Sequence, residues 1–163
     1  MFQVGDGIAY TNKGIFQIKE IKSKRNRKRE IESWYVLYRM KNDVETSITT
    51  PVTNPNLRLI MKEEDILALI DDMPTLQTVW NDDRHIREER FQTMLNSGDI
   101  RQWAIMLKTI FEMKKQKETI KKTISERDKF FFNQSVDLMF EEISLCLHIK
   151  REEVNDFIFS KLA

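Results

Sequence analysis

A tryptophan followed by three regularly spaced arginines is the part of the chain whose residue types could do chemistry. Trp80 precedes Arg84, Arg87 and Arg90, which lie three residues apart. At that spacing on a helix, the arginines would form one slanting cationic row on the surface. Cations attract phosphates, and a large apolar side chain beside them can wedge between the base steps of a nucleic acid. A solvated helix face beside a core tryptophan explains the same pattern, so this stretch alone leaves both interpretations open.

The chain contains none of the common catalytic or metal-binding motifs. It has no phosphate-binding GxxxxGK(S/T), no HExxH and no GxSxG, and neither His85 nor His148 has a nearby set of possible ligands. Cys146 is the single cysteine, which excludes an intramolecular disulfide, and its helical spacing with apolar neighbours favours a small core residue in a reducing compartment. We therefore expect no enzyme, no cofactor and no metal.

The arginine-bearing stretch lies within a series of about five expected helices that begins near residue 61. The first opens on acidic residues at 63–65 and ends at Pro74, and the second spans 80–98. Asp99 with Gln102 matches a capping box for a third helix that runs to near Lys117, and Trp103 falls on its apolar side. Ser125 opens a long fourth helix, and residues 152–162 form the last. In the second helix four residues are expected to face inward: Ile86, Phe91, Met94 and Leu95.

The first 60 residues have the alternation and turn residues of short β-strands. We expect five strands, around residues 8–10, 15–21, 34–38, 46–50 and 57–60. The highly charged segment 22–30 separates two of them and is expected to be a hairpin tip, either solvated or in contact with nucleic acid. The predicted fold class is α+β, with a small bent sheet of about five strands in residues 1–60 and an all-helical domain in residues 61–163.

Composition is that of a soluble globular protein, and we expect the protein to stay in the cytoplasm. Of the 163 residues, 40% are hydrophobic and 33% are charged, and the net charge is +1. The charge is uneven, since residues 1–60 carry 11 Lys and Arg against 6 Asp and Glu. A second basic sector lies in residues 100–129, which can attract phosphates without sequence specificity. No signal peptide or membrane span is expected.

Five short motifs occur along the chain in a fixed order. They are FQVGDGIAYTNKG at the start, Trp34-Tyr35-Val36-Leu37, Pro51-Val52, Leu57-Arg58 and Leu95-Asn96-Ser97-Gly98-Asp99. Each motif alone is weak, but in this order, across a change from β to helical character, they resemble the CarD family of bacterial transcription regulators. The resemblance covers essentially the whole chain.

The resemblance implies a function without catalysis. A Tudor-like module in residues 1–60 would dock on the β subunit of bacterial RNA polymerase, and the helical domain would contact promoter DNA at the upstream edge of the melted region. Trp80 corresponds to the family's tryptophan, which wedges into the minor groove and holds the bubble open. Arg84, Arg87, Arg90 and Lys129 would contact phosphates beside it.

The sequence also departs from the family pattern. Thr49 stands where some members use an arginine to grip the polymerase, so the basic residues Arg25, Arg27 and Arg29 are a weaker expectation for that contact. Asp82 and Asp83 put negative charge beside Trp80, where a phosphate should pass. An adaptor that binds protein partners without DNA is therefore the alternative function. We expect a monomer, with a strand-exchanged dimer as the alternative.

Overall fold

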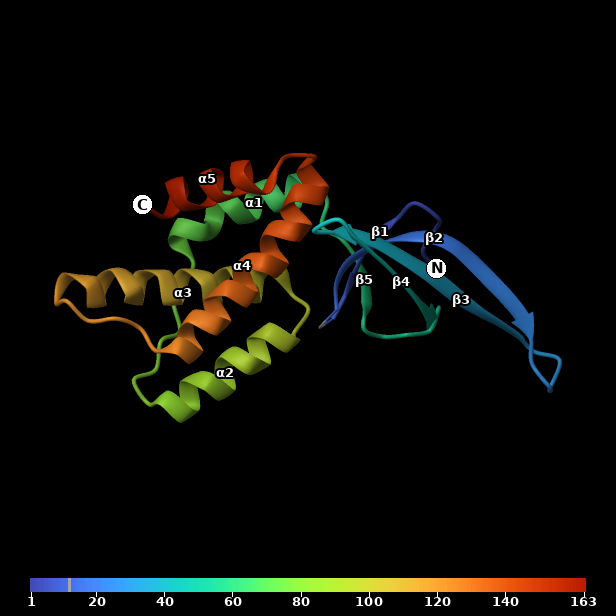
Figure 1. The fold of residues 1–163 in the computed structure, drawn as a ribbon, viewed down its shortest axis with the longest axis horizontal. Helices are drawn as coiled ribbons and strands as arrows, with labels where there is room; N and C mark the ends of the chain where they lie inside the picture. The colour runs from blue at the N-terminus through green and yellow to red at the C-terminus, as the bar shows by residue number, and fades with distance from the viewer. Residues whose placement is uncertain (12) are drawn as a thin grey trace. The chain divides into compact units, whose positions relative to one another are not determined.

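The computed structural model describes residues 1–11 and 13–163, which form two compact units. The first unit, residues 1–60, contains the β-strands, and the second, residues 61–163, contains the helices (Figure 1). The α+β fold class expected from the sequence is confirmed. None of the helices in the described part of the chain is long and apolar enough to cross a membrane.

The first unit is a single sheet in which every pair of neighbouring strands is antiparallel. Its strand order is β4-β3-β2-β1-β5. The strands are β1 (Gly7–Tyr10), β2 (Gly14–Arg25), β3 (Ile31–Lys41), β4 (Val44–Pro51) and β5 (Leu57–Leu59). Pro51 ends the edge strand β4, where the absence of a backbone N–H costs no central pairing. The core of the sheet contains residues that alternate along β2 and β3, together with one residue each from β1 and the edge strand β5: Phe16, Ile18, Tyr35, Leu37, Ile8 and Leu57.

In the hairpin between β2 and β3, the paired strands are longer and the tip is shorter than the sequence predicted. Residues 22–25 were expected to be loop because they are highly charged, but they pair with residues 31–34 as strand. In this two-stranded ribbon charged side chains remain in water, so charge does not oppose strand formation. Asn26 closes the tip, because its Oδ1 accepts hydrogen bonds from the backbone N–H groups of Lys28 and Glu30 at 2.8 and 3.0 Å.

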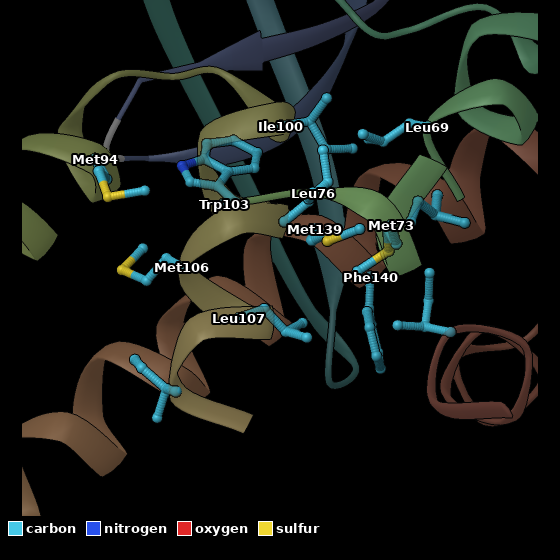
Figure 2. Packing of buried hydrophobic residues seen from close by; sticks show 14 of the residues in the cluster. Leu69, Met73, Leu76, Met94, Ile100, Trp103, Met106, Leu107, Met139 and Phe140 are labelled. Carbon is cyan, nitrogen blue, oxygen red and sulfur yellow. The ribbon is translucent and has the colours of Figure 1, made fainter. Parts of the chain in front are cut away.

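The second unit packs five α-helices and one 3₁₀ turn around a separate core. They are α1 (Glu63–Asp72), η1 (Met73–Thr75), α2 (Arg84–Asn96), α3 (Ile100–Thr119), α4 (Glu126–Leu147) and α5 (Arg151–Leu162). Helix α4 contacts each of the other four helices. The core includes Trp103, which is buried as expected, and its Nε1 donates to the carbonyl of Leu95 at 3.2 Å. Sulfur-containing side chains are spread through the same cluster: Met73, Met94, Met106 and Met139 (Figure 2).

Side-chain caps fix where the helices begin. The Asp99 carboxylate accepts from the backbone N–H of Arg101 at 2.9 Å, and Ser125 Oγ accepts from that of Asp128 at 3.1 Å, so α3 and α4 start at the residues expected from the sequence. At the other end of α4, His148 adopts the left-handed conformation and its backbone N–H bonds to the carbonyl of Ser144.

Candidate nucleic-acid interface

Trp80 lies in the segment that joins η1 to α2, four residues before the helix begins. Its side chain is half-buried and packs on the helical core, with its ring centroid 6.4 Å from that of Phe91. The indole Nε1 donates a hydrogen bond to Asp82 Oδ1 at 3.1 Å. The backbone before it is tied to α3, because the N–H of Val79 donates to Thr109 Oγ1 at 3.2 Å. Trp80 is therefore held in place and is only partly buried.

Arg87 is buried and does not belong to a surface row. Only 6% of the residue is exposed, and its Nε and Nη2 donate to the two carboxylate oxygens of Asp128 at 3.0 and 3.1 Å. Nη1 donates to the carbonyl of Asn81 at 2.8 Å, and the guanidinium carbon lies 4.2 Å from the centroid of the Trp80 ring. The expectation of three arginines on one exposed face is therefore wrong at Arg87, which instead supports the segment that carries Trp80.

Asp128 is placed to receive this arginine by the start of α4. It is fully buried, and Ser125 Oγ donates to its Oδ2 at 2.8 Å. The positive end of the helix dipole also favours a carboxylate in the first turn. Arg87 and Asp128 therefore form a bidentate ion pair whose hydrogen-bonding groups are satisfied, which is the arrangement in which burial of two charges is tolerated.

The other two arginines of α2 are exposed, and each has a contact within the unit. Arg84 Nε lies 2.8 Å from Glu88 Oε1. That hydrogen bond, and then the charge of the same carboxylate, raise the pKa of Arg84 above its ordinary value. Arg90 Nη1 donates to the carbonyl of Val79 at 3.4 Å. Ile86, expected to face inward, is 48% exposed, because the burial of Arg87 turns the inward face of the helix away from it.

The two acids beside Trp80 have specific roles. Asp83 is the N-cap of α2, with its carboxylate accepting from the backbone N–H of Ile86 at 3.1 Å. Asp82 accepts from the Trp80 indole. The negative charge that looked unfavourable for phosphate binding therefore helps to start α2 and to orient the tryptophan.

Two lysines outside α2, Lys129 and Lys117, also carry positive charge in the helical unit. Lys129, expected at the DNA surface, is exposed in the first turn of α4, and its Nζ lies 2.7 Å from Glu126 Oε1. Lys117, in the last turn of α3, places its Nζ 5.6 Å from the centroid of the Trp80 ring. Sequence reasoning missed Lys117 because it is far from Trp80 along the chain. The lysine-rich composition of residues 100–129 was the only signal.

The residues expected to bind polymerase are all exposed in the first unit. Arg25 ends β2, Arg27 and Arg29 lie in the following turn, and Thr49 lies on the edge strand β4. Arg25 pairs with Ile31 of β3, whereas Thr49 pairs with Val36 of the same strand. At about 3.3 Å per residue, these two pairing positions are roughly 17 Å apart, so the fold does not gather all four residues into one spot.

Within residues 1–11 and 13–163, no three His, Cys, Asp or Glu residues form a group that could hold a metal ion. Cys146 is partly buried, and its Sγ donates to the carbonyl of Met61 at 3.1 Å. Burial, followed by the carboxylates of Glu142 and Glu63, raises the pKa of the Cys146 thiol. At neutral pH the thiol is therefore protonated and able to donate this bond.

Comparison with known proteins identifies the helical unit. The family model for the C-terminal domain of CarD matches residues 66–159, which is more than half of the chain. The match includes most of each of the five helices. No curated protein sequence matches the chain. On the family match, the chain belongs to the CarD family of transcription regulators.

Proposed function

We propose that this protein binds the β subunit of bacterial RNA polymerase through residues 1–60 and contacts promoter DNA through residues 61–163. The DNA contact is at the upstream edge of the melted region, and its effect is to change the stability of the open complex. The protein acts in the bacterial cytoplasm, as a monomer, without catalysing a reaction. Its effect on the open complex depends on one chain binding both the polymerase and the promoter DNA.

The observation that carries the proposal is the match of the helical unit to the CarD C-terminal domain, together with the partly buried Trp80 beside positive charge. Inserting an apolar side chain at a base step costs a few kcal/mol of unstacking, so it stabilises only DNA in which that step is already distorted. A ligand that binds one of two states more tightly shifts the population towards that state. Contact of Trp80 with the edge of the bubble would therefore prolong the open complex.

Phosphate contacts would come from exposed cations of the helical unit. Arg84, Arg90 and Lys129 remain candidates, with ion pairs or hydrogen bonds within the unit that exchange readily for phosphate because they are exposed to water. For polymerase binding, the candidates are exposed residues of the hairpin or the edge strand: Arg25, Arg27, Arg29 and Thr49.

The first test is co-purification of the intact chain with core RNA polymerase, followed by promoter-opening kinetics. We expect Trp80→Ala to retain the fold and polymerase binding but to lose the effect on open-complex lifetime. Ile86→Ala, which changes an exposed apolar residue on α2, is the matched control and should behave as wild type. A Trp80→Ala variant that keeps its full effect on the open complex would exclude the wedge.

The acids beside Trp80 favour one alternative, a protein-interaction adaptor that uses the β unit and does not bind DNA. Asp82 occupies the indole N–H, and Asp83 lies next to it. This alternative predicts negligible binding to promoter DNA even at low salt, where phosphate contacts are strongest. Binding at low salt that falls steeply as salt is added would exclude the adaptor.

A further inference from the structure

The C-terminal end of α3 carries positive charge that the family match does not assign to a role. Lys114 and Lys117 are three residues apart on the helix, and Lys121 and Lys122 follow in the turn after it. We refer to these four residues as the α3 lysine end. Within the described part of the chain, none of the four side chains forms an ion pair with an acid. The carbonyls at a helix C-terminus are negative, which stabilises cations there but leaves their outer side available to an anion.

Lys117 is distinguished within the α3 lysine end by its position. It is partly buried, whereas the other three are exposed, so its aliphatic stem lies against the unit. Its ammonium lies 5.6 Å from the centroid of the Trp80 ring. A cation near an aromatic face at an accessible site contributes only about 0.5–1 kcal/mol, which a phosphate contact can replace. The ammonium is therefore fixed near Trp80 and still able to bind an anion.

Two of the three arginines of α2 are less well placed for the same task. Arg87 is fully engaged with Asp128 and Asn81, and Arg84 is paired with Glu88. The structure thus removes one cation from the expected row and neutralises another. Among the residues that the structure describes, Lys117 and Arg87 are the cations that lie over the Trp80 ring, and Lys117 is the one that is not already bound to a carboxylate.

From this geometry we propose that Lys117 contacts a phosphate of the DNA strand that Trp80 contacts, so that the interface is formed by the α3 lysine end together with the segment before α2. The inference rests on the proposed function, because it places a second contact at the same DNA. Trp80 would select distorted DNA, and Lys117 would bind the backbone beside it without regard to sequence.

The test is fluorescence anisotropy of the intact chain with a labelled promoter fork junction between 50 and 200 mM KCl. Loss of one phosphate contact lowers the slope of log affinity against log salt by about one. We expect this change, and weaker binding at the low-salt end, in Lys117→Gln. Lys117→Arg keeps the charge and should restore the slope.

Lys115 provides the matched control on the same helix. Its ammonium lies 5.1 Å from the centroid of the Phe111 ring, so it is also a lysine beside an aromatic residue. At about 100° per residue, however, Lys115 and Lys117 are some 200° apart around α3 and cannot reach the same phosphate. Lys115→Gln should therefore leave both the affinity and the slope as in wild type.

The outcomes separate this inference from the proposed function. If Trp80→Ala weakens DNA binding but Lys117→Gln keeps the wild-type slope and affinity, the assignment of Lys117 is wrong and the DNA-binding function stands. An equal loss in Lys115→Gln and Lys117→Gln would also overturn it, since the effect would then reflect net charge. If the wild-type chain does not bind the fork junction at 50 mM KCl, the DNA-binding function and the inference fail together.

Discussion

Arg87 combines a buried ion pair with support of the residue proposed to meet DNA. Its guanidinium binds both oxygens of Asp128 and lies against the Trp80 ring. The residue is buried, so it is not exposed to an external phosphate. Its Nη1 also holds the carbonyl of Asn81, the residue after Trp80. One side chain therefore fixes both the backbone and the ring of this segment. An arginine is needed because only its planar, multi-donor group can make these contacts at once.

The first prediction concerns this ion pair. Asp128→Ala leaves the guanidinium of Arg87 buried without a countercharge, and we expect a loss of about 3–5 kcal/mol in the free energy of unfolding. Urea denaturation followed by circular dichroism measures it. Glu126→Ala, which breaks the exposed pair with Lys129 on the same helix, is the control and should cost at most about 1 kcal/mol. A cost as small for Asp128→Ala as for the control would contradict the assignment.

At the scale of single residues, sequence reasoning succeeded where one local pattern decides the outcome. Trp103 was expected in the core because it keeps helical phase with apolar neighbours, and it is buried. Arg87 was assigned to the surface because of its spacing from Arg84 and Arg90. Its burial depends on Asp128, 41 residues further along the chain, and no helical periodicity carries that information.

At the scale of elements, the start of α2 shows how an acid can serve a domain proposed to bind DNA. Asp83 satisfies the backbone N–H of Ile86, which has no partner within the helix. A serine at the same position can accept this hydrogen bond without carrying charge. The capping role and the electrostatic role of Asp83 can therefore be separated by substitution.

The prediction at this scale compares two variants of Asp83. Asp83→Ala removes the cap and should lower the free energy of unfolding by about 1 kcal/mol, whereas Asp83→Ser should leave it within a few tenths. Urea denaturation of the two variants measures the difference. Equal stability of Asp83→Ala and wild type would show that the cap contributes nothing to the fold.

The elements themselves were predicted best where caps and breakers mark them. Asp99 and Ser125 cap the starts of α3 and α4, as expected, whereas α1 ends at Asp72, two residues before Pro74. The prediction was least accurate for the β2–β3 hairpin, because a run of charged residues was assigned to a loop. Pairing in this ribbon depends on backbone hydrogen bonds between strands, whose register with residues 31–34 the sequence pattern did not reveal.

At the scale of the whole molecule, the change from alternating to helical periodicity was enough to predict the α+β class. What the sequence did not reveal is how the helical unit holds its own first residue. The backbone N–H of Met61 donates to the buried carboxylate of Glu142 at 2.9 Å, and its carbonyl accepts from Cys146. Both partners are on α4, more than 80 residues away. The chain entering the second unit is therefore bound to the central helix of that unit.

This anchoring leads to a prediction about where the helical unit can be cut. A fragment of residues 61–163 retains both Met61 contacts and the complete helical core, so we expect it to fold alone with cooperative thermal unfolding. A fragment of residues 64–163 leaves the Glu142 carboxylate without the Met61 donor. Loss of a hydrogen bond to a buried charged group costs about 2 kcal/mol or more, so its unfolding midpoint should be several degrees lower.

Calorimetry of the two fragments and the intact chain measures these midpoints. A third fragment, residues 59–163, controls for chain length, because it adds residues of the first unit and keeps the Met61 contacts. It should unfold at the same midpoint as residues 61–163. If residues 61–163 lack cooperative unfolding, the helical unit depends on the sheet for its stability. If instead all three fragments share one midpoint, the Met61 contacts contribute nothing, and the buried carboxylate of Glu142 is stabilised by its other neighbours.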